Sequence, residues 1–183
     1  MKILRLVIIG LILLVAVLAV VGLLLPDTVR VERSITINAS PDSIFPKVNS
    51  VAVFREWSPW YQRDPDMEVS YSGPDSGVGA AVEWSSNQSD VGSGRQIITE
   101  SREYEYVGYD LDFGAQGKAQ AWFEFEPSAN STTEQPMTDV TWGFTTDFGY
   151  DLIGRYFGLV LESMLAPDYE EGLKGLKTVV EKG

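Results

Sequence analysis

Two different hydrophobic patterns divide the chain near residue 26. Residues 3–25 form a continuous apolar run in which Arg5 is the single charge. A helix that crosses about 30 Å of hydrocarbon needs about 20 apolar residues. The run exceeds the ~7–15 apolar residues of a cleaved signal peptide and ends at Pro26 without a small-residue cleavage site. The pattern predicts a retained transmembrane anchor over residues 1–26, with a cleaved signal as the alternative, followed by one domain over residues 27–183.

The domain begins with a predicted strand and two short helices. Residues 29–38 alternate between apolar and polar positions, which is typical of a half-buried strand. A Ser-Pro pair then favours a helix start, and Pro46 limits its length. We expect one helix to about Val48 and a second over residues 51–56. The segment Trp-Ser-Pro-Trp-Tyr at residues 57–61 is expected to be an aromatic-rich loop.

Six further strands are predicted from segments of alternating or apolar character that are separated by turn residues. Regular spacing of this kind favours a meandering antiparallel sheet. A polar stretch over residues 127–135 has no periodic pattern and reads as a loop. The six predicted strands cover residues 67–72, 80–86, 94–102, 103–113, 117–126 and 138–146.

The pattern changes to helical spacing near residue 153. Apolar residues recur there at intervals of three and four, which predicts one face of an amphipathic helix. Pro167 interrupts this stripe, and we expect one long helix that is kinked or stepped there and continues to the C-terminus. Together with the strands, the helix predicts an α+β fold. The stripe comprises Ile153, Tyr156, Phe157, Val160, Leu161, Met164 and Leu165.

Composition excludes several classes of function. The formal net charge of -12 disfavours binding to nucleic acid or to anionic headgroups. The domain is rich in aromatic residues, so it is not a disordered segment. The chain has neither His nor Cys. It therefore lacks the usual metal ligands and the usual base at physiological pH, and we expect no cofactor and no metal.

Carboxylates are the main remaining candidates for acid–base chemistry. They occur as pairs two residues apart, and such pairs share one face of a strand. Catalytic pairs need one buried member with a shifted pKa, whereas these pairs are expected to lie on the solvated face. Glu83 and Glu100, beside predicted inward positions, are slightly better candidates. The pairs are Asp64/Asp66, Asp110/Asp112 and Glu124/Glu126.

Several motifs resemble one known superfamily. They are VERSITINASP at residues 31–41, WSPW at 57–60, YSGP at 71–74, GVGA at 77–80 with Trp84, and MLAPDYEEGLKGLK at 164–177. Together they resemble the SRPBCC (START/Bet v 1-like) superfamily, and within it the membrane-anchored polyketide cyclase/dehydrase-like group. The resemblance implies a helix-grip fold, in which a curved antiparallel sheet of about seven strands surrounds a long C-terminal helix and encloses an apolar cavity.

The resemblance also implies which residues contact a ligand in that cavity. On the helix they are Tyr156, Phe157, Val160 and Met164, and on the sheet they are Trp84, Phe123, Trp142 and Phe144. Trp57, Trp60 and Tyr61 are expected at the cavity entrance. The alternative is that these side chains are plain core, and that the two tryptophans hold the loop onto the sheet.

The leading functional hypothesis is a membrane-anchored domain that binds an apolar small molecule or lipid. An accessory subunit of a larger membrane protein complex is the alternative. A third hypothesis is a cyclase or dehydrase, and such an enzyme would need a buried, positioned acid or base. Lys2 and Arg5 precede the apolar run. They favour a cytoplasmic N-terminus and a domain on the periplasmic side of a bacterial inner membrane.

Overall fold

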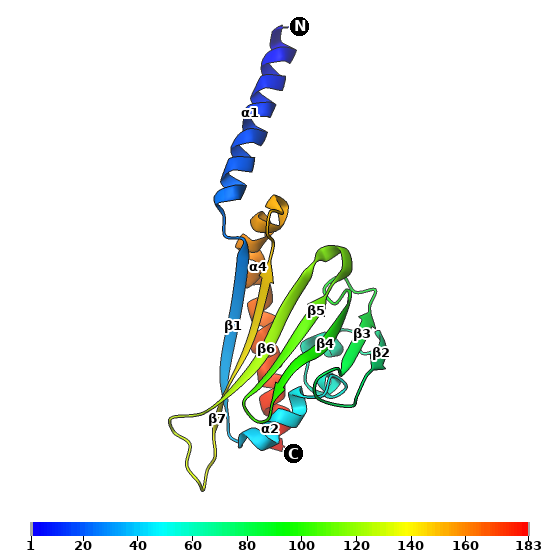
Figure 1. The fold of residues 1–183 in the computed structure, drawn as a ribbon, viewed down its shortest axis with the longest axis vertical. Coiled ribbons are helices and arrows are strands. Elements are labelled where there is room, and N and C mark those ends of the chain that lie inside the picture. The colour runs from blue at the N-terminus through cyan, green and yellow to red at the C-terminus, as the bar shows by residue number, and fades with distance from the viewer. Residues whose placement is uncertain (1, 183) are drawn as a thin grey trace.

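The computed structural model describes residues 2–182 as an apolar helix followed by a sheet-and-helix domain (Figure 1). This confirms the predicted α+β architecture. The elements in chain order are α1 (Lys2–Leu24), β1 (Thr28–Ile37), α2 (Pro41–Val48), the 3-10 helix η1 (Val53–Glu56), α3 (Pro59–Arg63), β2 (Glu68–Ser72), β3 (Ala81–Ser85), β4 (Ser93–Arg102), β5 (Tyr106–Asp112), the 3-10 helix η2 (Gly114–Gln116), β6 (Lys118–Pro127), β7 (Thr138–Asp147) and α4 (Leu152–Lys182).

All seven strands form one antiparallel sheet in the order β1-β7-β6-β5-β4-β3-β2. Strands β2 to β7 follow one another as a meander, and β1 pairs with β7 as the edge strand at the other side of the sheet. The register shifts between Ile98 and Glu100 of β4, and such a bulge bends a strand. Figure 1 shows the sheet curving, with α4 behind β1, β7 and β6.

The inner face of β1 contains one charged side chain, Arg33, among its apolar positions. Val31 and Ile37 are buried on that face, as the alternation predicts. Arg33 reaches α4, where its guanidinium lies 3.2 Å from Glu170 and 3.3 Å from Glu162. The break in the apolar pattern is therefore an ionic contact between the first strand and the last helix.

Two local predictions are corrected by the structure, and a third is confirmed. Residues 59–63 form the short helix α3 rather than a loop, because Pro59 follows the extended Ser58 at a favourable first helical position. The strand predicted from residue 103 begins at Tyr106, since residues 102–105 form a turn with Tyr104 at a φ of 63°. The prediction of one long C-terminal helix is confirmed, because Pro167 lies inside α4 and does not end it.

The core is built around stacked aromatic rings between the sheet and α4. Trp142 of β7 stacks on Phe123 of β6 at 5.0 Å and on Tyr169 of α4 at 4.0 Å. Trp57 meets Trp142 edge-on at 5.4 Å. Burial on α4 is concentrated after residue 165, where Leu173 and Leu176 are buried with Tyr169. The first half of α4 presents many apolar side chains on the surface.

Candidate ligand-binding site

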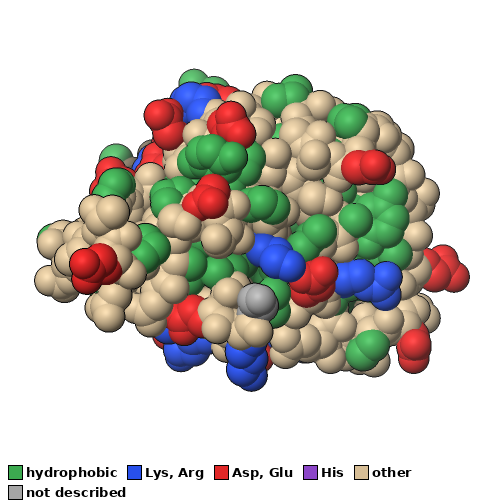
Figure 2. Space-filling view, turned by 90° about the horizontal axis from the view of Figure 1, so that it is seen from below, with side chains coloured by type: hydrophobic (Ala, Val, Ile, Leu, Met, Phe, Trp, Pro, Cys, Tyr) green, Lys and Arg blue, Asp and Glu red, His purple; other side chains and the backbone are tan. Residues whose placement is uncertain are grey.

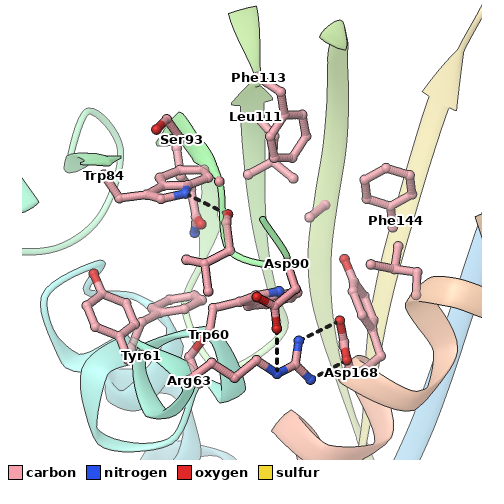
Figure 3. Close-up of a pocket in the computed structure, with 18 of the residues that line it drawn as sticks. Trp60, Tyr61, Arg63, Trp84, Asp90, Ser93, Leu111, Phe113, Phe144 and Asp168 are labelled. Atoms are coloured by element: carbon pink, nitrogen blue, oxygen red, sulfur yellow. Dashed lines mark hydrogen bonds and ion pairs between the residues drawn. The ribbon is translucent and has the colours of Figure 1, made fainter. Parts of the chain in front are cut away.

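A cavity of about 570 Å³ lies between the sheet, α3, the loop from β3 to β4, and the middle of α4 (Figure 3). Strands β3 to β7 supply one wall, and most of the side chains there are apolar or aromatic. The helix supplies Leu161, Met164 and Leu165 to the opposite side. A concave, mainly apolar space of about 300–1,000 Å³ is typical of small-molecule sites.

Part of the aromatic set predicted from the sequence lines this cavity. Trp84 and Phe144 lie on opposite sides of it in Figure 3. Trp60 and Tyr61 approach the cavity from α3 near Arg63, and their place at an entrance stays a prediction. That any of them contacts a ligand stays a prediction. The predicted residues that line the cavity are Trp60, Tyr61, Trp84, Trp142, Phe144 and Met164.

Two predicted aromatic residues belong to the core instead. Phe123 is fully buried behind the wall, between Trp57 and Trp142. The expectation that Trp57 lies at the entrance is wrong, because its side chain is 0% exposed. Its indole Nε1 donates a hydrogen bond to the Lys47 carbonyl at 3.0 Å. Its ring also packs edge-on against Phe123 and Trp142 of the sheet, so Trp57 holds this segment onto the sheet, which is the structural role weighed as its alternative.

Three predicted helix residues also lie away from the cavity wall. Tyr156 packs on α1, and its hydroxyl donates a hydrogen bond to the Leu18 carbonyl at 2.7 Å. Phe157 and Val160 are 45% and 48% exposed. The physical reason is that the first turns of α4 extend past the cavity toward α1. One part of the apolar stripe therefore lines the cavity, and the other part packs on α1 or lies on the surface.

Sequence reasoning missed an ionic cluster at one edge of the cavity. Arg63 of α3 forms a two-point hydrogen-bonded ion pair with Asp168 of α4, with one bond of 3.1 Å. It also contacts Glu171 at 3.2 Å and Asp90 of the β3–β4 loop at 4.0 Å (Figure 3). Hydrogen bonding to Asp168 is the main cause that raises the pKa of Arg63. Arg63 and Asp168 are 105 residues apart, so no local pattern signals the pair.

Tyrosine hydroxyls, together with several Ser and Gln side chains, are further polar groups of the cavity wall. Burial, and then a hydrogen bond with Tyr71, raise the pKa of Tyr61 well above its usual value. Burial likewise raises the pKa of Tyr109 and of Tyr169. Tyr109 donates to the Val48 carbonyl at 2.6 Å. These hydroxyls are therefore neutral near pH 7 and act as hydrogen-bonding groups rather than as tyrosinate bases.

The carboxylates singled out in the sequence lie outside this cavity wall. Glu83 and Glu100 are at least half exposed and pair with Arg95 and Arg102 on neighbouring positions. Asp112 pairs with Lys118 at 3.2 Å on the outer surface. Within residues 2–182, no group of three or more acidic side chains is placed to hold a metal ion.

A seven-stranded antiparallel sheet that grips a long C-terminal helix around a cavity defines a helix-grip domain of the SRPBCC type. The chain belongs to the family described as polyketide cyclase / dehydrase and lipid transport, whose model matches residues 28–181. The resemblance seen in the sequence is thereby confirmed. No curated protein matches the chain.

Solved structures with the same fold differ widely in sequence. A norcoclaurine synthase point mutant from Thalictrum flavum, in complex with a transition-state analogue, has a TM-score of 0.61 and 11% identity, covering 85% of this chain and 95% of that one. Protein XoxI from Bacillus cereus has a TM-score of 0.56 and 15% identity, covering 83% and 95%. Protein CV1439 from Chromobacterium violaceum has a TM-score of 0.52 and 17% identity, covering 85% and 99%.

Proposed function

We propose that this protein is a membrane-anchored binding protein for an apolar small molecule or a lipid. The observation that carries the proposal is the cavity of about 570 Å³ with aromatic and aliphatic walls. Burying apolar ligand surface there is favourable in proportion to the area removed from water. The family description, which includes lipid transport, supports the same class of ligand.

The distribution of polar groups suggests an amphipathic ligand. The wall around Val82, Ala121 and Phe144 is apolar, whereas the charged groups Arg63, Asp168 and Asp90 gather at one edge. A ligand with an apolar body and a polar end fits this division, because its polar end keeps hydrogen-bonding partners when the body is buried. Arg63 is paired with three carboxylates there, so the cluster as a whole is negative and favours a hydrogen-bond donor at the polar end of the ligand.

The anchoring half of the proposal rests on α1. Among residues 2–182 it is the one helix long and apolar enough to cross a membrane, and a signal sequence near an N-terminus can also meet these criteria. The contacts of α1 support retention: Arg155 of α4 donates hydrogen bonds to the carbonyls of Leu23 and Leu25, each at 3.0 Å. Cleavage after Leu25 would remove partners from a guanidinium that is almost fully buried. We place the domain outside the cytoplasm, because Lys2 and Arg5 precede α1.

Native mass spectrometry of the full-length protein in mild detergent, followed by lipid extraction, tests the proposal. We expect a constant additional mass of small-molecule or lipid size. Leu111→Trp places a larger side chain in the cavity wall and should remove that mass. Val78→Trp, at an exposed position in the loop from β2 to β3, is the matched control and should retain it.

Two results would count against the proposal. An empty wild-type protein that also binds no apolar fluorescent probe contradicts a ligand-binding cavity. Retention of the same mass by Leu111→Trp places the ligand elsewhere. Co-purification of protein subunits without a small ligand would favour the accessory-subunit alternative.

A further inference from the structure

The first three turns of α4 carry an apolar surface that no element within residues 2–182 covers. Ile153 is 83% exposed, Phe157 45% and Val160 48%. Their spacing of four and three residues places them on one helical face. Leu159 and Tyr150, close to them in the sequence, are also exposed. An exposed apolar surface of this kind marks an interaction site on a soluble domain.

The same turns are joined to α1 by specific contacts. Gly22 of α1 is buried against Leu152 and Tyr156, and a Cβ at Gly22 would lie 3.1 Å from the Tyr156 ring. Arg155 donates to the last carbonyls of α1, which have no partner within that helix. Its positive charge also suits the negative end of the α1 dipole. Figure 1 shows the start of α4 beside the lower end of α1.

These contacts set the level of α4 relative to the membrane. Arg155 is held at Leu23 and Leu25, where the apolar run ends. The Tyr156 hydroxyl reaches the Leu18 carbonyl, and a helical rise of about 1.5 Å per residue puts Leu18 about 10 Å further along α1 than Leu25. If α1 crosses the bilayer, the first turns of α4 therefore lie at the depth of the headgroups and the adjoining acyl chains.

Few charged side chains lie in this region, and most of them have partners. Within residues 152–161 the single charge is Arg155, which faces α1 and Asp27. Asp151 accepts the backbone N–H of Ile153 at 3.0 Å. The next acidic residue, Glu162, pairs with Arg33. At the opposite end of the molecule, by contrast, hydrophobic side chains are interspersed with acidic and basic ones (Figure 2).

We propose that the face formed by Ile153, Phe157 and Val160 is a bilayer-binding surface that inserts into the lipid interface beside α1. Interfacial helices bury an apolar face about 5–10 Å into the boundary between headgroups and acyl chains. The domain is then held at a fixed orientation on the membrane rather than on a flexible tether. The same face continues to Met164, which lines the cavity. The proposal requires α1 to be a retained span, but it does not require a ligand in the cavity.

Site-directed spin labelling of the full chain tests this surface directly. Because the chain contains no Cys, single-label variants need no background substitution. Labels at Ile153→Cys and Phe157→Cys report on the surface, Leu13→Cys reports on α1, and Val78→Cys is an exposed reference in the domain. Each variant is placed in phosphatidylcholine nanodiscs at one copy per disc, and collision with oxygen and with a water-soluble nickel chelate is measured.

We expect the labels at Ile153 and Phe157 to collide with nickel several-fold less than the label at Val78, and with oxygen more. The inference is overturned if both labels match Val78 while Leu13 is immersed. Exposure of Leu13 as well would instead show that α1 is not in the bilayer, so the proposed anchor fails with it. Protection at Ile153 and Phe157 that appears only with two copies per disc would overturn lipid insertion in favour of self-association.

Discussion

Substitution of Gly175 by Ala is predicted to destabilise the protein, although glycine is a poor helix former. In an exposed helix interior this change stabilises by about 1 kcal/mol. Here the backbone of α4 passes directly over the end of η1. A Cβ at Gly175 would lie 2.5 Å from the carbonyl oxygen of Trp57. The structure therefore reverses the sign expected from helix propensity.

The size of the effect follows from what must move. A backbone carbonyl has no rotamer that relieves the contact, so α4 must shift away from Trp57. Overpacking by one methyl group costs about 1–3 kcal/mol, and contact with the backbone favours the upper end. After subtraction of about 1 kcal/mol of propensity gain, we expect a net loss of about 2 kcal/mol. For a chain of this size that lowers Tm by about 4–8 °C.

Thermal unfolding of the purified protein, followed by circular dichroism, measures this change. Thr178→Ala is the matched control, since Thr178 is exposed on the same helix and bonds only to the Lys174 carbonyl among the described contacts. That control should gain about 0.5 kcal/mol from helix propensity. If Gly175→Ala were as stable as the wild type, the close approach of α4 to Trp57 would be refuted.

Three further predictions concern charged side chains. Hydrogen bonds, the largest contribution being from the backbone N–H of Asn38, lower the pKa of Glu181. The ionised carboxylate therefore stabilises the fold above pH ~4.5, and this stabilisation is lost as the pH falls through the lowered pKa. Glu181→Gln should lower Tm at pH 7 and make little difference near pH 3. Arg155→Met should broaden the distance distribution between spin labels on α1 and α4, because α1 loses its cap, whereas Arg30→Met, an exposed control, should leave it unchanged. Arg63→Met should speed release of a bound apolar probe in stopped-flow fluorescence, and an unchanged rate would show that the ionic cluster does not restrict the cavity.

Local pattern predicted the elements well because burial imposes a local period. The alternation in β1 places Val31 and Ile37 inward whatever the rest of the chain does. The prediction failed where a local signal had two outcomes. Pro59 fits a turn or the start of a helix, and packing decides for α3.

The candidate site was predicted only in part, because facing inward is not the same as facing a cavity. Phe123 and Phe144 lie on adjacent strands and both point toward α4. Phe123 is covered by Trp57 and Trp142, whereas Phe144 remains on the cavity wall. The distance between sheet and helix at each point decides this, and that distance depends on every residue in the layer.

The sequence by itself determined that an apolar helix precedes one α+β domain, and it determined most of the strands and helices that form this domain. Those properties depend on residues close together in the chain. Only the tertiary structure decided that Arg63 meets Asp168, that Arg155 holds the end of α1, and that the apolar stripe of α4 is shared between a cavity and an open surface. The two arginine contacts join residues more than 100 positions apart. The energy of each depends on how far the folded structure excludes water from both partners.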